Sequence, residues 1–405
     1  MDQKNLRIED YTYALPDERI AKHPLAERDA SKLLIYERGK ITEDIYRNIA
    51  QHIPSKTLMV FNQTRVVNAR LLFKKSTGSV IEVFCLAPHS RYADIHTAML
   101  QKGHVLWECL VGGAGKWKDG ITLQLAHTAP DFVLSATIKE RHPGAFILQL
   151  EWDDKELTFA EILHYAGKVP LPPYMNRDAA IDDESRYQTV FAKEEGSVAA
   201  PTAGLHFTHG IMESIVAKNI DTAFLTLHVG AGTFRPVKSV TMAEHDMHAE
   251  WMEVTTDTLQ KLIAHLGNGI VAVGTTSLRT LESLYWVGNQ LVNGLPVDFN
   301  GIAVTQWHPY ETTTTCSPAQ ALTALLQYMS ANKLEKIITR TQILIAPGYH
   351  FRIIKGLVTN FHQPQSTLLL LVAAITGTGW HTIYDHAMQH DYRFLSYGDG
   401  SLLWL

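Results

Sequence analysis

The chain has 405 residues, of which 46% are hydrophobic and 19% are charged, with a net charge of −5 and a pI near 6.5. This balance is typical of a soluble globular enzyme and excludes disordered chains, fibrous chains and a protein that holds nucleic acid by overall charge alone. A single core stops growing at roughly 250–300 residues, so we expect two or three cores.

No segment reads as a targeting signal or a membrane span. The N-terminus is charged from its second residue, and the longest apolar run, residues 368–375, is shorter than the roughly 20 residues that cross a bilayer. We expect that run to be a buried helix. The three cysteines show neither paired nor metal-ligand spacing, which favours the reducing cytoplasm.

The first 150 residues show two different sequence patterns. Residues 58–61 form a predicted core strand, and the polar residues 62–65 follow it directly, where open α/β sheets bind ligands. From residue 71 to 150 the pattern changes to short β-rich runs separated by glycine-containing turns. These runs are residues 80–84, 107–111, 121–125, 133–137 and 146–150. The pattern predicts a small antiparallel barrel or sandwich.

After residue 151, apolar runs alternate with helical spacing. The predicted buried strands are residues 223–227, 269–273 and 342–345, and the predicted helices are residues 208–219, 256–266 and 318–329. The simplest architecture is a mixed α/β main domain, residues 1–70 and 151–405, interrupted by an inserted all-β barrel domain, residues 71–150.

Three stretches carry residues that packing does not require. Residues 199–209, 226–234 and 359–367 each set histidine beside threonine, glycine or asparagine. Small residues let a ligand approach the backbone, and the polar side chains supply donors and acceptors.

A fourth stretch, residues 273–279, follows an apolar strand and precedes a helix. The hydroxyls of Thr275 and Thr276, with the free amides, suit an anion or carboxylate, although helix capping alone is the commoner reason for such residues. Arg279 favours the functional interpretation, because its guanidinium pairs a carboxylate bidentately.

Two other site classes receive little support. His245 and His248 have spacing that brings two rings to one metal on a helix, but no third ligand is identifiable nearby, so a zinc hydrolase is a weak alternative and we expect no metal site. Gly204, Gly230 and Gly232 do not follow the dinucleotide-binding fingerprint, which disfavours nicotinamide binding.

Many separate motifs then occur in one order along nearly the whole chain. They are residues 15–16 with 20–21, 24–28, 60–62 with 64–66, 170–174, 186–190, 198–207, 226–234 with 236–237, 245 with 247–248 and 250, 272–276, 347–348, 357–362, 366–368 and 392–394 with 396–399. Through them the sequence resembles the S-adenosylmethionine:tRNA ribosyltransferase-isomerase family of queuosine biosynthesis.

The resemblance implies a reaction and a fold. Family members transfer and isomerise the ribosyl portion of S-adenosylmethionine onto 7-aminomethyl-7-deazaguanine at the wobble position of a tRNA, which gives epoxyqueuosine and releases adenine and methionine. The implied fold is an α/β domain with an inserted β-barrel. We expect S-adenosylmethionine as co-substrate, no tightly bound cofactor, the tRNA anticodon arm as partner, no membrane partner and a monomer.

The chemistry calls for a base beside the sulfonium, a donor to the departing adenine and a neutral attacking amine. Imidazole suits proton transfer near neutral pH, so His206, His228 and His362 are the acid/base candidates. The binding candidates are Thr202, Thr233 and Asn360 for the adenosyl moiety, Thr275, Thr276 and Arg279 for the methionine carboxylate, Arg65 and Arg393 for phosphate or ribose, and Asp399 for a sugar hydroxyl or the aminomethyl group.

Local basic residues on the barrel-like segment are candidates for RNA contact. They are Lys74, Lys75, Lys116, Trp117, Lys118, Arg141 and His142. The charges suit phosphate and the indole suits base stacking, while a solvated barrel surface explains the same residues equally well.

The chain departs from the family pattern at several positions. Arg340 and Lys355 stand where the family has acidic residues, and Gln363 stands where it has leucine. The segment of residues 284–340 is also longer than expected. It is either a surface elaboration or a changed tRNA or substrate surface, as in a paralogue that acts on another acceptor or has become a noncatalytic binding protein.

Overall fold

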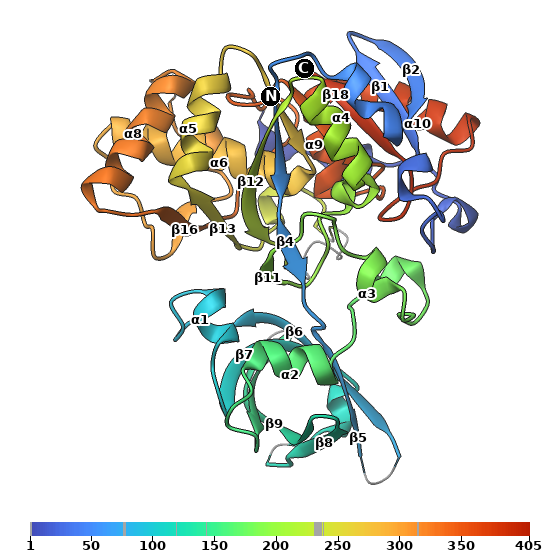
Figure 1. Cartoon of the computed structure of the whole chain (residues 1–405), viewed down its shortest axis with the longest axis vertical. Coiled ribbons are helices and arrows are strands. Elements are labelled where there is room, and N and C mark those ends of the chain that lie inside the picture. Colours follow the sequence, from blue (N-terminus) through green and yellow to red (C-terminus); the bar gives the residue numbers. More distant parts are fainter. Residues whose placement is uncertain are drawn as a thin grey trace.

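The computed structural model describes residues 2–75, 78–118, 120–142, 144–230, 237, 239–313 and 316–405. A large lobe of helices around a ten-stranded sheet lies beside a smaller lobe built on a six-stranded sheet (Figure 1). The chain is therefore a mixed α/β protein, as its sequence predicts. The division into a main domain and an inserted domain with the stated boundaries stays a prediction.

The large sheet has a parallel centre. Its order is β15 (Ile302–Val304), β16 (Lys336–Thr341), β13 (Glu250–Thr255), β12 (Asp221–His228), β3 (Leu58–Asn62), β14 (Ile270–Val273), β17 (Gly356–Asn360), β18 (Gly400–Trp404), β1 (Lys32–Glu37) and β2 (Lys40–Ile45). The four strands from β12 to β17 run parallel to one another. Their carboxyl ends therefore meet at one edge, where such sheets bind ligands.

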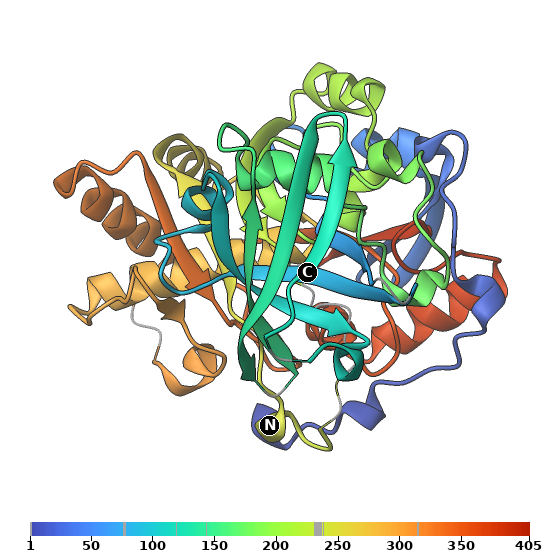
Figure 2. The ribbon, with the colours of Figure 1, turned by 90° about the horizontal axis from the view of Figure 1, so that it is seen from below.

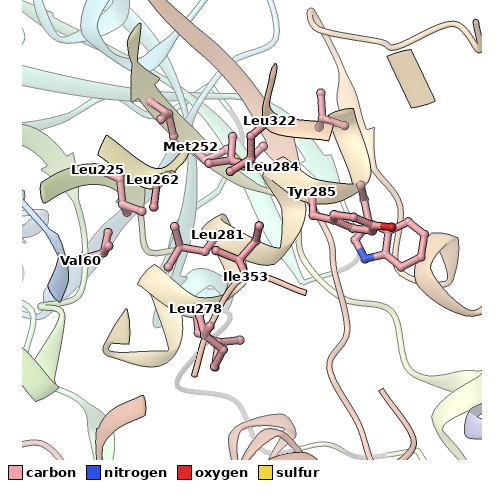
Figure 3. Close-up of a cluster of buried hydrophobic side chains, with 14 of the residues drawn as sticks. Val60, Leu225, Met252, Leu262, Leu278, Leu281, Leu284, Tyr285, Leu322 and Ile353 are labelled. Carbon is pink, nitrogen blue, oxygen red and sulfur yellow. The ribbon is translucent and has the colours of Figure 1, made fainter. Parts of the chain in front are cut away.

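Helices cover this sheet on both faces because its central strands are apolar on both sides. They are α4 (His209–Ala217), α5 (Thr256–His265), α6 (Thr275–Val292), α8 (Pro318–Ala331), α9 (Thr367–Thr376) and α10 (Gly379–Gln389), with the short helices α3 (Asp183–Arg186) and α7 (His308–Glu311) in loops. The predicted helices in residues 208–219, 256–266 and 318–329 are confirmed. In the largest core cluster, Leu278, Leu281 and Leu284 of α6 pack near Val60 of β3 and Leu225 of β12 (Figure 3).

The smaller sheet is antiparallel and nearly closed. Its order is β5 (Arg70–Lys74), β6 (Val80–Pro88), β7 (His104–Gly112), β10 (Ala145–Trp152), β9 (Asp131–His142) and β8 (Leu123–Thr128). The end strands β5 and β8 lie against each other, which gives the ring in Figure 1. Alternate residues such as Leu71, Phe73, Ile81 and Val83 point inward, as period-two spacing requires.

One strand pair lies between the two sheets, and two helices complete the core of the ring. The strands β4 (Thr64–Val66) and β11 (Glu194–Ser197) pair in parallel between the two sheets. The helix α2 (Phe159–Ala166) packs Phe159, Ile162 and Leu163 into the core of the ring, and α1 (Ile95–Met99) adds to the same core. Figure 2 shows the long strands of the smaller sheet lying across the large lobe in this view.

One strand predicted from the sequence is absent. Residues 342–345 form no strand: the chain leaves the sheet after Thr341, and the amide of Gln342 bonds to the carbonyl of Val304 at 2.9 Å. The run is apolar because Ile343 and Ile345 are buried in the largest core, and burial alone does not specify strand pairing.

The segment of residues 284–340 is not a surface elaboration. It contributes β15 and β16 to the sheet and packs α8 against α6, with Leu322, Leu325 and Met329 fully buried. In the part of the chain that the structure describes, no single helix is long and apolar enough to cross a membrane, and α9 with α10 pass that test only as a pair bent by 111°.

The contact between α6 and α8 generates a first prediction. A Cβ added at Gly288 of α6 would overlap the carbonyl of Ala321, the backbone of α8. We expect Gly288→Ala to lower the free energy of unfolding by about 1–3 kcal/mol, because a well-packed interior resists added volume. Urea denaturation followed by circular dichroism measures this change.

The matched control is Gly267→Ala, because nothing lies within 4 Å of a Cβ added there. This variant should unfold at nearly the wild-type urea concentration. Equal midpoints for the two variants would show that α6 and α8 are not in close contact.

Candidate functional site

A first cavity lies at the carboxyl ends of β14 and β17. The motif stretches that the sequence singled out converge on it, together with the aromatic side chains of Tyr174 and Tyr187. Its polar lining comes from Thr202, Thr275, Thr276, Thr359, Asn360, His362, Gln363, Ser366 and Ser396. The volume is about 90 Å³, and the wall is mostly apolar. Such a lining suits a flat, weakly polar group held by a few hydrogen bonds.

The turn between β14 and α6 forms one wall. Gly274 has a φ of +90°, which only glycine adopts without strain, and its amide bonds to the carbonyl of Val358 at 2.8 Å. Thr275 and Thr276 then begin α6, so the unpaired amides and the positive end of the helix dipole lie at the cavity. Carboxylate binding at this helix start stays a prediction.

Asn62 at the end of β3 holds this wall in place. Its side-chain oxygen accepts the amide of Leu227 at 3.1 Å, and its side-chain nitrogen donates to the carbonyl of Leu227 at 2.9 Å and to the hydroxyl of Thr276 at 3.3 Å. The sequence indicated only a polar cluster after a strand. That Asn62 joins β12 to α6 becomes apparent only once the position of β12 is known.

His206 ends the 3-10 helix η8 (Thr202–His206) and is buried behind Asn360. Its Nδ1 lies 3.2 Å from the carbonyl of Arg28, and its Nε2 lies 3.4 Å from the side-chain nitrogen of Asn360. Thr202 donates its hydroxyl to the side-chain oxygen of Asn360 at 2.8 Å. One tautomer of His206 satisfies both contacts: Nδ1 donates to the carbonyl of Arg28, and Nε2 accepts from the side-chain amide of Asn360.

Burial also keeps His206 neutral. It lowers the pKa of the ring to about 4, and the ring stacks on Tyr46 with centroids 4.3 Å apart. His206 lines a separate small pocket with Arg28 and Arg186 rather than the first cavity. The geometry fits a residue that orients Asn360 better than one that exchanges protons with a ligand.

His362 does line the first cavity. Its Nε2 lies 2.8 Å from the hydroxyl of Thr359, and its backbone amide donates to the hydroxyl of Tyr384 at 2.9 Å. Burial lowers the pKa of the ring to about 3, so it is neutral near pH 7. A neutral imidazole can accept a hydrogen bond from a ligand, although a pKa this low makes the ring a weak proton acceptor.

His228 lies apart from this cavity, between β4 and β13. Its Nδ1 is 3.3 Å from the hydroxyl of Thr64, and its Nε2 is 3.6 Å from a carboxylate oxygen of Glu253, which also pairs with Lys336 at 2.7 Å. Burial by itself would raise the pKa of Glu253, but the His228 ring and the Lys336 ammonium outweigh it and lower the pKa to about 2. The surroundings of His228 are those of a structural ion-pair cluster.

A second cavity of about 620 Å³ adjoins the first, and the two share Gln363, Ser366 and Leu368. Arg279 of α6 lines it. The guanidinium pairs with Glu250 through Nη1 and donates from Nε to the carbonyl of Ile343 at 3.2 Å. Thr275 and Thr276, which the sequence grouped with Arg279 as carboxylate-binding residues, line the first cavity instead. The structure therefore places the three residues at two different cavities.

The remaining predicted binding residues lie elsewhere. Thr233 is outside the described residues. Arg65 is exposed and lies 3.8 Å from Glu195. The buried carboxylate of Asp399 accepts the amides of Lys32 at 2.9 Å and Arg393 at 2.8 Å. Asp399 is therefore a backbone clamp, which corrects the expectation that it binds a sugar hydroxyl or an amine.

The Arg393 guanidinium lies 3.5 Å from the same carboxylate and 3.4 Å from the hydroxyl of Ser31. These contacts tie the loop before β18 to the start of β1. They give Arg393 a structural role in the described part of the chain.

The basic residues of the smaller sheet are only partly available to a partner. Trp117 is 1% exposed and donates its indole nitrogen to the carbonyl of Ile121 at 2.8 Å, so its expected base stacking is wrong for this conformation. Lys75 donates to the carbonyl of Lys116 at 2.7 Å. The side chains of Lys74, Lys116 and Lys118 are exposed.

Histidine clusters occur in two places. His245 and His248 line the second cavity. Among the described residues, the group with metal-ligand geometry is Glu43 of β2 with His386 and His390 of the α10 end, whose ligand atoms lie within 4.8 Å of one another. The Nε2 of His386 is 2.9 Å from Glu43, so an ordinary hydrogen bond already explains this contact.

Comparison with known proteins gives three similarities. A family profile described as "Queuosine biosynthesis protein" matches residues 8–403. An S-adenosylmethionine:tRNA ribosyltransferase-isomerase from Halothermothrix orenii is 36% identical, over 98% of this chain and 100% of that protein. A solved S-adenosylmethionine tRNA ribosyltransferase from Thermotoga maritima is 27% identical with a TM-score of 0.46, over 97% of this chain and 99% of that one. The chain belongs to the queuosine biosynthesis protein family.

Proposed function

We propose that this protein transfers and isomerises the ribosyl moiety of S-adenosylmethionine onto 7-aminomethyl-7-deazaguanine at the wobble position of tRNA. Epoxyqueuosine-tRNA forms, and adenine and methionine leave. The family membership and the 36% identical ribosyltransferase-isomerase support this function. The observation that carries it is the first cavity, on which separate motif stretches of the chain converge.

Size determines how the co-substrate lies. Pockets for small molecules usually measure about 300–1,000 Å³, so the first cavity, at about 90 Å³, takes only part of S-adenosylmethionine. The second cavity, at about 620 Å³, takes the rest. A cavity of about 150 Å³ holds one benzene ring, so the first cavity takes only an edge of the adenosyl group, beside Thr202 and Asn360, and the rest of that group extends toward the second cavity. We assign the methionine carboxylate to the start of α6 and Arg279.

The three histidines then differ in role. Of the three, His362 is the acid/base candidate because it lines the first cavity. His206 orients Asn360, and His228 stabilises the junction of β4, β12 and β13. The sequence names all three as acid/base candidates without distinguishing them.

The tRNA contacts and the domain division are part of the same proposal. We assign the anticodon arm to the smaller sheet, through the exposed Lys74, Lys116 and Lys118 with Lys75, and phosphate contact to the exposed Arg65. Residues 71–150 then form the RNA-binding barrel domain, and residues 1–70 with 151–405 form the catalytic domain. The protein acts as a cytoplasmic monomer without a tightly bound cofactor.

The reaction is tested directly. Purified protein with S-adenosylmethionine and tRNA bearing 7-aminomethyl-7-deazaguanine should release adenine and form epoxyqueuosine, detected by chromatography and mass spectrometry of the nucleosides. The same tRNA with guanine at that position is the control and should give neither product. Folded protein that binds the tRNA and releases no adenine would contradict the proposed reaction.

The histidine roles predict an order of effects. His362→Ala should lower kcat for adenine release about 10²–10⁴-fold, the usual loss for an acid/base group. His206→Ala should mainly raise the KM for S-adenosylmethionine, because Asn360 loses its orientation. His228→Ala should lower the melting temperature more than kcat. If His362→Ala keeps the wild-type rate, another group handles the proton.

The smaller sheet is tested by charge reversal. Lys116→Glu with Lys118→Glu should weaken tRNA binding and reduce its salt dependence, because fewer counterions are released. Equilibrium dialysis with S-adenosylmethionine should give the wild-type affinity. Lys333→Glu, an exposed change just after α8 in the large lobe, is the control for altered charge. Unchanged tRNA affinity in the double variant would remove the smaller sheet from the RNA interface.

A further inference from the structure

A small pocket in the large lobe is lined by two arginines that the proposed reaction does not use. Its buried end is formed by Ser31, Leu205, His206 and Tyr397, and its half-buried rim by Pro24, Leu25, Arg28 and Arg186. The volume is about 10 Å³, which is roughly the space that one water-sized oxygen atom needs. The pocket therefore admits a single oxygen atom between a closed floor and a rim that carries two cations.

Neither guanidinium group is balanced by a carboxylate in the part of the chain that the structure describes. Arg28 donates from Nη1 to the carbonyl of Gln188 at 3.0 Å. Arg186 donates to the carbonyl of Ala26 at 3.3 Å and to that of Leu25. These bonds hold the rim together but leave both positive charges in place, because a backbone carbonyl carries no net charge.

The acidic side chains near the two arginines in the sequence do not supply the missing charge. Three of them already have cationic partners: Glu27 and Asp29 pair with Arg47, and Asp183 pairs with Arg177. Two others, Asp182 and Glu184, are exposed and pair with neither arginine. The positive charge at the pocket therefore calls for an anion from outside the described residues.

Two further observations point to an acceptor atom in the pocket. The Nε of Arg186 is buried and has no hydrogen-bond partner among the described residues. Burial, together with the nearby charge of Arg186, lowers the pKa of Arg28. A buried donor without a partner and two like charges at one pocket are both unfavourable, and a bound oxyanion relieves both.

A phosphate group within a nucleic-acid backbone fits this pocket. It can insert one non-bridging oxygen between the guanidinium groups while its two sugars stay outside. The pocket also adjoins the reacting site: the carbonyl of Arg28 lies 3.2 Å from His206, which lies 3.4 Å from Asn360 of the first cavity. In the proposed reaction, the substrate that brings such a phosphate to this place is the tRNA.

We propose that Arg28 and Arg186 bind one backbone phosphate of the tRNA anticodon arm. This inference rests on the proposed function and names a contact that holds the acceptor beside the first cavity. It extends the RNA interface from the lysines of the smaller sheet to the large lobe.

The first test removes one phosphate charge at a time from the RNA. Filter-binding assays compare tRNAs that each carry one neutral methylphosphonate in the anticodon arm. Substitution at the bound phosphate should weaken binding to the wild-type protein about tenfold, the loss expected for a hydrogen bond to a charged group. In the double variant Arg28→Gln with Arg186→Gln, that position should lose its effect, while positions bound by the smaller sheet keep theirs. The wild-type measurement does not depend on the stability of any variant.

Salt dependence gives the second readout. The double variant should reduce the slope of log affinity against log salt by about 0.7–0.9, the value for one phosphate contact. Arg186→Lys should keep most of the slope because it keeps the charge. The affinity for S-adenosylmethionine should stay within twofold of wild type, because His206 contacts the backbone of Arg28 and not its side chain. Arg38→Gln, an exposed change in the turn between β1 and β2, is the matched control and should behave as wild type.

Three outcomes would overturn the inference. Equal losses in the wild type and the double variant at every methylphosphonate position would show that the two arginines touch no phosphate. A weaker affinity for S-adenosylmethionine, with tRNA binding unchanged, would assign the pocket to the carboxylate of the co-substrate. A melting temperature that rises with inorganic phosphate in the wild type alone, without a methylphosphonate effect, would assign it to a free anion. None of these measurements needs turnover, so failure of the phosphate site is distinguished from failure of the reaction, which adenine release reports.

Discussion

The buried carboxylate of Glu282 in α6 fixes the geometry on which both cavities depend. It accepts the backbone amides of Arg352, Ile353 and Ile354 and the hydroxyl of Tyr349, and burial raises the pKa of its carboxyl. Residues 352–354 lead directly into β17, whose far end carries Asn360. The same helix begins at the first cavity, so one buried contact sets the distance between two walls of the site.

Burial gives the surroundings of the two cavities different charge. Around the first cavity it depresses the pKa values of His206 and His362, so this region is neutral at physiological pH. Charged groups line the second cavity, where Arg279 pairs with Glu250. A neutral, mostly apolar pocket suits part of the adenosyl group, and the larger charged cavity suits the methionine. The shared wall at Gln363 is where the reacting atoms would meet.

The sequence patterns predicted secondary structure correctly where the spacing of the apolar residues matches the buried face of the element. Period-two alternation gave the strands of the smaller sheet, and helical spacing gave α4, α5 and α8. The same reasoning failed at residues 342–345, because an apolar run reports burial and not hydrogen-bond partners. It failed at Trp117 for a related reason: an aromatic between two lysines looks exposed in sequence, while the turn folds it into the ring.

The sequence by itself determined the fold class, the family and the motif stretches that meet at the first cavity, because these depend on residue types in order. Only the tertiary structure separated His362, which lines that cavity, from His206 behind Asn360 and His228 in an ion-pair cluster. It alone placed Arg279 in a second cavity and occupied Asp399 with backbone amides. These distinctions depend on which segments pack face to face, and residue spacing along one chain does not encode the distance between strands.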